Sequence, residues 1–282
     1  MTTEQEGHAR FLRRVGSVQE MGMRVALWRE LLEDNHPDDA LSTLLYVMEA
    51  NHRKSNDGYL AMLAFARLLV THRSLVEGSI LPAAVVSRCD HIVDLVTERA
   101  PARKIELAER RIPSLDKDRE VTLGERRALA RSRDRHIIDR LLRDPDEGVI
   151  KNLLQNSRVR ERDVLLIAST QPISGAVLEV VFRSDRWGNR REIQLALLQN
   201  PYTPTLITRA LVELVDEAGL RSVALAQSIE ENVLALVQEK LRSLPDEGGG
   251  ESAQLDDAWV LSLLERRERN PRPAFREDDA PS

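Results

Sequence analysis

The sequence of 282 residues has little of what several kinds of protein chemistry require. It contains one cysteine, Cys89, and a single thiol can form neither an internal disulfide nor the ligand set of an iron–sulfur cluster. Aromatic residues make up only 4% of the chain. The sequence has no long run in which Val or Thr alternates with polar residues, so we expect little β-sheet.

Long apolar runs are also missing. No stretch approaches the roughly 18 uncharged apolar residues that a membrane-spanning helix needs, and residues 1–14 lack the apolar core of a signal peptide. We therefore expect a cytoplasmic protein with no membrane partner. The net charge of −5 argues against a general nucleic-acid binder, because such binding depends on neutralising phosphates.

Motifs for catalysis and cofactor binding are absent as well. There is no Gly-x-Ser-x-Gly nucleophile elbow, and the glycines at 248–250 have no lysine after them, as a phosphate-binding loop would. Cys89 and His91 are two positions apart, so on a helix they would point to opposite faces and could not share a metal ion. We expect no catalytic residue, no metal and no cofactor, and the sequence does not identify a ligand.

What the sequence does contain is a repeated pattern of short apolar stripes and turns. Leucine doublets at helical spacing precede Asp144, Asn156 and Asn200. We expect Asn200 to end a helix in the left-handed conformation that asparagine tolerates, and Thr203 to cap the next helix. Helices this short are marginal alone, so stacked neighbours must bury their stripes in a common core.

The turns resemble those of the leucine-rich repeat variant family. Residues 144–157 combine an Asp-Pro turn with a short helix ending in Leu-Leu-Gln-Asn, residues 164–168 follow as a second helical segment, and residues 200–204 read Asn-Pro-Tyr-Thr-Pro. Ser157 stands where that pattern has a proline. The resemblance implies a right-handed helical solenoid related to HEAT repeats. Residues 122–215 also resemble a bacterial family of unknown function that opens with Thr-Leu-Gly-Glu-Arg.

The predicted fold class is therefore all-α, with a HEAT-like or leucine-rich-variant-like solenoid after an N-terminal helical bundle. We place the bundle at residues 1–98, a charged linker at 99–121, the solenoid at 122–243, and a flexible tail with one short helix at 244–282.

Within the bundle we expect four helices, which begin near Ser17, Asp38, Asp57 and Pro82. Ser17–Glu20, Thr122–Glu125 and Ser228–Glu231 match the capping-box pattern at helix starts.

One loop is the best candidate for contact with a partner. Its candidate residues are Arg183, Arg186, Trp187, Arg190 and Arg191, and Arg and Trp are enriched at binding hot spots. Alternatively, Trp187 packs between adjacent repeats and arginine stems cover it.

The favoured function is a non-enzymatic scaffold that binds a protein partner. The alternative is a nucleic-acid-binding repeat protein that uses the arginines of residues 126–143 and 183–191. The basic run at 126–143 would also suit an acidic partner, of which the acidic tail of this same chain is one candidate.

Overall fold

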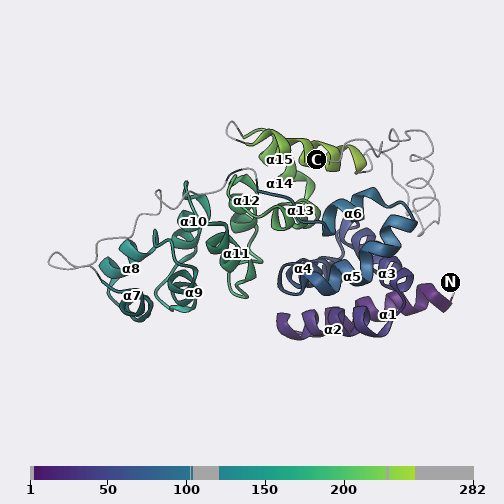
Figure 1. Cartoon of the computed structure of the whole chain (residues 1–282), viewed down its shortest axis with the longest axis horizontal. Coiled ribbons are helices and arrows are strands. Elements are labelled where there is room, and N and C mark those ends of the chain that lie inside the picture. Colours follow the sequence, from purple (N-terminus) through teal and green to yellow (C-terminus); the bar gives the residue numbers. More distant parts are fainter. Residues whose placement is uncertain (1–2, 102, 104–120, 227–228, 245–282) are drawn as a thin grey trace, which may run out of the picture.

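The computed structural model describes residues 3–101, 103, 121–226 and 229–244, and these form fifteen α-helices and no strand. The all-α prediction is therefore confirmed for this part of the chain (Figure 1). Predictions for residues 104–120 and for the tail from residue 245 lie outside the described residues, as does Ser228 of the third expected capping box.

Six helices form the N-terminal part: α1 (Thr3–Ser17), α2 (Met21–Asp34), α3 (Pro37–His52), α4 (Asn56–Thr71), α5 (Arg73–Val86) and α6 (Asp90–Val96). Helix α4 is central, because it packs against α1, α2, α3 and α5. All nine residues from Ala61 to Leu69 are buried. Only Arg67 interrupts this apolar run, and the indole of Trp28 donates a hydrogen bond to the Ala61 carbonyl (2.8 Å).

Two expected helix starts in this part are wrong. Ser17 ends α1 instead of opening α2, since its hydroxyl donates to the Arg14 carbonyl (2.8 Å). Pro82 lies inside α5. A proline within a helix costs about 3 kcal/mol, but Val76, Ile80 and other apolar residues on both sides of it are buried on one face, and this packing keeps the helix continuous.

Nine helices follow: α7 (Leu123–Leu129), α8 (Arg135–Leu141), α9 (Glu147–Gln155), α10 (Glu161–Ser169), α11 (Gly175–Arg183), α12 (Arg191–Gln199), α13 (Thr205–Leu214), α14 (Glu217–Ala224) and α15 (Glu231–Ser243). Alternate helices pack on each other, α7 on α9 on α11 and α10 on α12 on α14. Figure 1 shows α7, α9 and α11 in one row below α8, α10 and α12. The Thr122–Glu125 capping box is confirmed at the start of α7.

Side chains at the ends of these helices join each turn to an earlier one. Asn156 donates to the carbonyls of Ala130 (2.9 Å) and Ser132 (2.7 Å), and Asn200 donates to those of Ala168 (2.7 Å) and Thr170 (3.0 Å). The last carbonyls of a helix have no partner within the helix, so these amides satisfy groups that would otherwise be buried without a hydrogen bond.

Asn200 follows the end of α12, as expected, but its backbone is extended rather than left-handed (φ −86°, ψ 117°). Thr203 does not cap α13 either. Its hydroxyl donates to the Leu197 carbonyl (2.6 Å), and Pro204 is the residue at the cap position. Asparagine is therefore used here for its side-chain amide rather than for its tolerance of positive φ.

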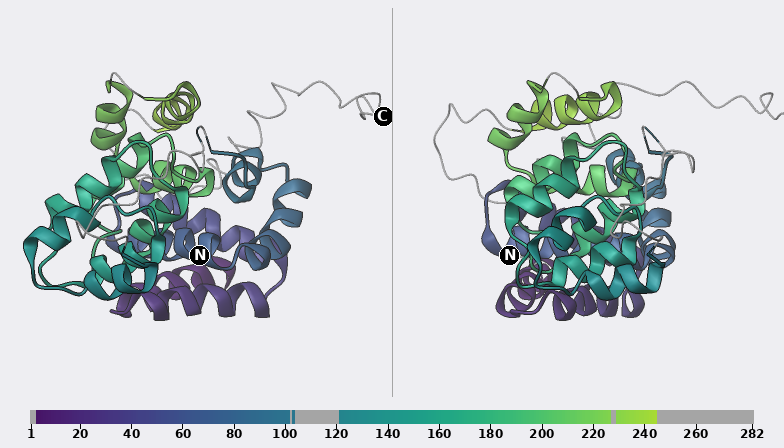
Figure 2. Two further views of the ribbon diagram at one scale, coloured as in Figure 1. Left: turned by 60° about the vertical axis from the view of Figure 1, so that its left-hand side comes forward. Right: turned by 90° about the vertical axis from the view of Figure 1, so that its left-hand side faces the viewer.

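Helix α13 joins the N-terminal helices to the later ones. Every residue from Leu206 to Leu214 is buried, and α13 packs on α4 and α6 as well as on α12 and α15. One continuous apolar core therefore runs from Val15 to Val237. Figures 1 and 2 show α1 and α2 on the opposite side of the molecule from α15.

No single described helix is long and apolar enough to cross a membrane. Helices α4 and α5 together have the length and composition of a span, but the pair is bent by 112° at the break between them.

Candidate functional site

The candidate partner-binding loop lies between α11 and α12, and its charged side chains have contacts within the chain. Three of its arginines form ion pairs: Arg183 with Glu179 (3.1 Å), Arg190 with Glu161 (2.6 Å) and Arg191 with Asp216 (3.0 Å). The first pair lies within α11, and the other two link α12 to its neighbours α10 and α14.

Trp187 is buried, with 2% of its surface exposed. Its indole N–H donates to the carbonyl of Leu154 near the end of α9 (2.9 Å). The guanidinium groups of Arg186 and Arg190 lie 4.4 and 5.1 Å from its ring centre. Trp187 is therefore a buried contact covered by arginines, as in the alternative given above, and its indole packs against the end of α9.

The carbonyls of the same loop face helix α4. Arg67, which is 4% exposed, donates to the carbonyls of Arg183 (3.0 Å) and Ser184 (2.9 Å) and contacts the Asp185 carboxylate. Burial lowers the pKa of Arg67, and Asp185 offsets part of this effect. The forked donors of one guanidinium thus satisfy the last carbonyls of α11.

Tyr59, about two turns before Arg67 in α4, makes a second contact with the same loop. Its hydroxyl donates to the Asn189 carbonyl (3.3 Å) and accepts a hydrogen bond from the Gln194 amide (3.0 Å). The loop at 183–191 is thus bound by the N-terminal helix α4 of its own chain. Binding of a separate protein by the five candidate residues stays a prediction.

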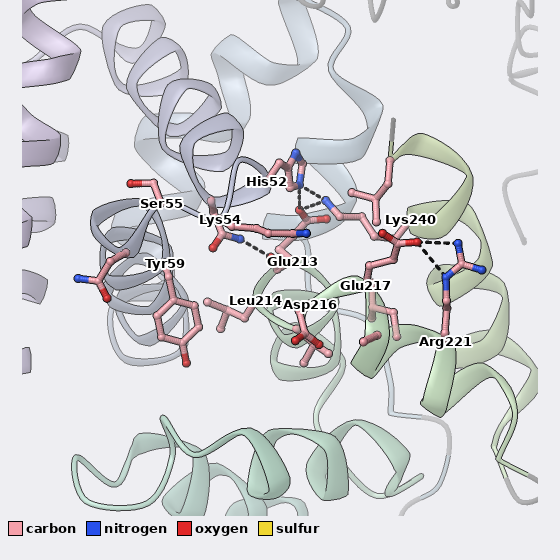
Figure 3. Close-up of a pocket in the computed structure, with 16 residues that line it drawn as sticks. His52, Lys54, Ser55, Tyr59, Glu213, Leu214, Asp216, Glu217, Arg221 and Lys240 are labelled. Atoms are coloured by element: carbon pink, nitrogen blue, oxygen red, sulfur yellow. Dashed lines mark hydrogen bonds and ion pairs between the residues drawn. The ribbon is translucent and has the colours of Figure 1, made fainter. Parts of the chain in front are cut away.

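A second candidate site is a cavity of about 760 Å³ where the N-terminal helices meet α13, α14 and α15. Figure 3 shows Lys54 and Tyr59 on its N-terminal wall, facing Asp216, Glu217 and Arg221 of α14 and its cap. Its volume lies within the range of small-molecule pockets, about 300–1,000 Å³.

Glu213 of α13 is the most deeply buried charge of this cavity, with its side chain 2% exposed. Its carboxylate lies 2.5 Å from the Lys240 ammonium, 3.4 Å from the His52 imidazole and 3.1 Å from the His91 imidazole. These partners come from α15, α3 and α6. Burial raises the pKa of Glu213, but Lys240 and His91 outweigh burial and hold the pKa well below its usual value.

These contacts decide what the cavity can do chemically. A carboxylate whose pKa is held well below its usual value is a weak general base and a poor proton donor near neutral pH, because efficient catalysis of that kind needs a pKa close to the working pH. Glu217 pairs with Arg221 (2.6 Å) on the other wall. Among the described residues, no group of three or more His, Cys, Asp or Glu side chains could hold a metal ion. Glu213 and its partners Lys240, His52 and His91 thus join four helices.

His91 should make stability depend on pH. Burial lowers the pKa of His91, but Glu213 outweighs burial and raises it above the ordinary value of 6.5. A raised pKa stabilises the folded state fully below about pH 6.5, and this contribution disappears as the pH rises through the folded-state pKa. The side chain is 52% exposed, so solvent screening should keep the loss below about 1 kcal/mol. Urea unfolding at about pH 6 and pH 8.5 measures it.

His91→Gln should remove this difference between the two pH values, since glutamine does not titrate. His136→Gln is the matched control, because His136 is also exposed. An unchanged pH dependence in His91→Gln would contradict the assignment.

Sequence reasoning missed Arg67, Glu213 and the histidine and lysine partners of Glu213. A signal was present, because Arg209 and Glu213 interrupt the apolar run of residues 206–215, and Arg67 interrupts that of residues 60–70. A charge within an otherwise apolar helix indicates a buried ion pair or a functional site. The partners of these charges could not be read from the sequence, because they lie on distant helices.

Comparison with known proteins gave no match among protein-family models, curated proteins or solved structures.

Proposed function

We propose that the chain is a non-enzymatic helical-repeat scaffold that binds a protein partner, with residues 122–243 as a solenoid. The observation that carries the proposal is the repeated link between successive turns. Asn156 and Asn200 each donate two hydrogen bonds to an earlier turn, and Trp187 donates one to the end of α9. The Asn156 and Trp187 links join the α7–α8, α9–α10 and α11–α12 loops in series, and the Asn200 links join the α10–α11 and α12–α13 loops. An extended surface of stacked loops is what repeat proteins offer to partners.

The charges at the cavity support binding over catalysis. Glu213 has basic partners on three other helices, and Glu217 has one within α14, so both carboxylates are used in contacts within the chain. A nucleophile with an adjacent general base would instead favour an enzyme.

Contacts within the chain also point to the surface where a partner would bind. The loop at 183–191 is held by Arg67 and Tyr59 of α4. The α7–α8 and α9–α10 loops belong to helices that extend away from the N-terminal part (Figure 1). We therefore place the partner on these two loops. A cytoplasmic location remains the expectation from sequence.

Photo-crosslinking tests the proposal. A photo-reactive amino acid is placed at Ser157, an exposed residue of the α9–α10 loop, and in a second variant at Met23, which is 57% exposed on α2. In cells that naturally express the protein, the Ser157 variant should give one discrete protein adduct that the Met23 variant lacks. The same adducts from both positions, or none from Ser157, would contradict the proposal.

A further inference from the structure

Two neighbouring loops place arginines side by side on this surface. The Asn156 amide donates to the Ser132 carbonyl (2.7 Å), and its oxygen accepts a hydrogen bond from the Arg158 backbone N–H (2.9 Å). Ser132 lies between Arg131 and Arg133 in the sequence. A single side chain thus fixes the α7–α8 loop beside the α9–α10 loop.

The arginines of these two loops are exposed. We call Arg131, Arg133, Arg158 and Arg160 the arginine edge; all four are exposed. Within the described part of the chain none of them forms an ion pair, unlike the three paired arginines of the loop at 183–191. The Arg-x-Arg pattern recurs after 27 residues, at 131–133 and 158–160.

Carboxylates close to the arginine edge in sequence have other contacts. The Asp134 side chain caps α8 by accepting a hydrogen bond from the His136 N–H (2.8 Å). Asp163 is buried and accepts two hydrogen bonds from Arg135, and Glu161 pairs with Arg190. The edge therefore presents positive charge to solvent.

The guanidinium fork suits carboxylates and phosphates equally, because both accept two parallel hydrogen bonds. One observation favours carboxylates here. Single-stranded nucleic acids gain much of their affinity by stacking bases on aromatic rings, but Trp187, in the adjacent α11–α12 loop, is buried.

We propose that the arginine edge binds an acidic segment, rich in Asp or Glu, of a separate protein. This inference rests on the proposed scaffold function and adds the chemistry of the partner. The segment would lie across the two stacked loops, with its carboxylates on the guanidinium groups of Arg131, Arg133 and Arg158.

Fluorescence anisotropy tests the inference with labelled poly-glutamate added to the full-length protein. Arg131→Gln, Arg133→Gln and Arg158→Gln are combined in an edge variant. Arg10→Gln, Arg13→Gln and Arg143→Gln form a matched control, since these arginines are also exposed but lie elsewhere. The edge variant should bind about tenfold more weakly, or ~1.4 kcal/mol, and the control should bind like the original protein.

Helix content and the urea midpoint should be unchanged in the edge variant, because Arg131 makes only an exposed contact of 3.4 Å with the neutral Asn152 and no buried contact is lost. Binding should also weaken as salt is raised, because these charges are exposed. Equal binding of the edge and control variants, or no binding of poly-glutamate by the original protein, would overturn the inference.

Two further probes identify other occupants. Edge-dependent binding of oligo-thymidylate but not of poly-glutamate would assign the edge to nucleic acid. Edge-dependent binding of a peptide with the sequence of residues 245–282, again without poly-glutamate binding, would assign it to the tail of this chain. Either result overturns the inference. A discrete adduct from Ser157 without poly-glutamate binding would leave the scaffold function standing and reject the acidic partner alone.

Discussion

Replacing Glu213 by alanine is expected to lower the free energy of unfolding by about 3–5 kcal/mol, the usual cost of removing one partner of a buried ion pair. Lys240 is 6% exposed and would keep its charge without the carboxylate that balances it. Domains are stable by only about 5–15 kcal/mol, so this change should produce a large fall in the urea midpoint.

Glu217→Ala is the matched control. It removes the neighbouring ion pair with Arg221, whose side chain is 68% exposed, and pairs of this kind on a helix contribute only about 0.3–0.5 kcal/mol. Similar losses for the two variants would contradict the structural role assigned to Glu213.

Replacing Trp187 by alanine is the second change with a large expected effect, also about 3–5 kcal/mol, because it opens a cavity between α9 and the α11–α12 loop. Trp187→Phe keeps most of the apolar surface but leaves the Leu154 carbonyl without its donor, so it should cost about 1–3 kcal/mol. Urea unfolding measures both losses.

Met23→Ala serves as the control for this pair, because a side chain that is 57% exposed should change stability by less than about 0.5 kcal/mol. Trp187→Ala without loss of stability would mean that the indole is not the buried contact described here, and would return Trp187 to the role of an exposed residue that binds a partner.

Much of the local structure could be predicted from the sequence. Apolar stripes at helical spacing predicted an all-α chain, and the Thr122–Glu125 pattern predicted a capping box that the structure contains. Both depend on residues a few positions apart. Pro82 was misread because its effect is set by the packing of α5, which local patterns do not report.

The role of each charged side chain could not be predicted in this way. The arginines and the tryptophan of the loop at 183–191 made it stand out in the sequence. The direction of the Trp187 side chain, however, depends on the Leu154 carbonyl near the end of α9, which accepts the indole hydrogen bond. The contact of Arg67 with Arg183 and Ser184 joins residues more than 115 positions apart. The sequence contains no local signal for such a pair.

The central claim is that the N-terminal helices and the later helices share one core, joined by α13 and the loop at 183–191. Trp28 is buried in the first part and Trp187 in the second, so each can report on its own region once Trp259 is replaced by phenylalanine. Two further variants then keep only one tryptophan each, through Trp28→Phe or Trp187→Phe. In each, urea unfolding followed by tryptophan fluorescence should coincide with loss of helix measured by circular dichroism. Separate transitions, with one region unfolding before the other, would contradict the claim.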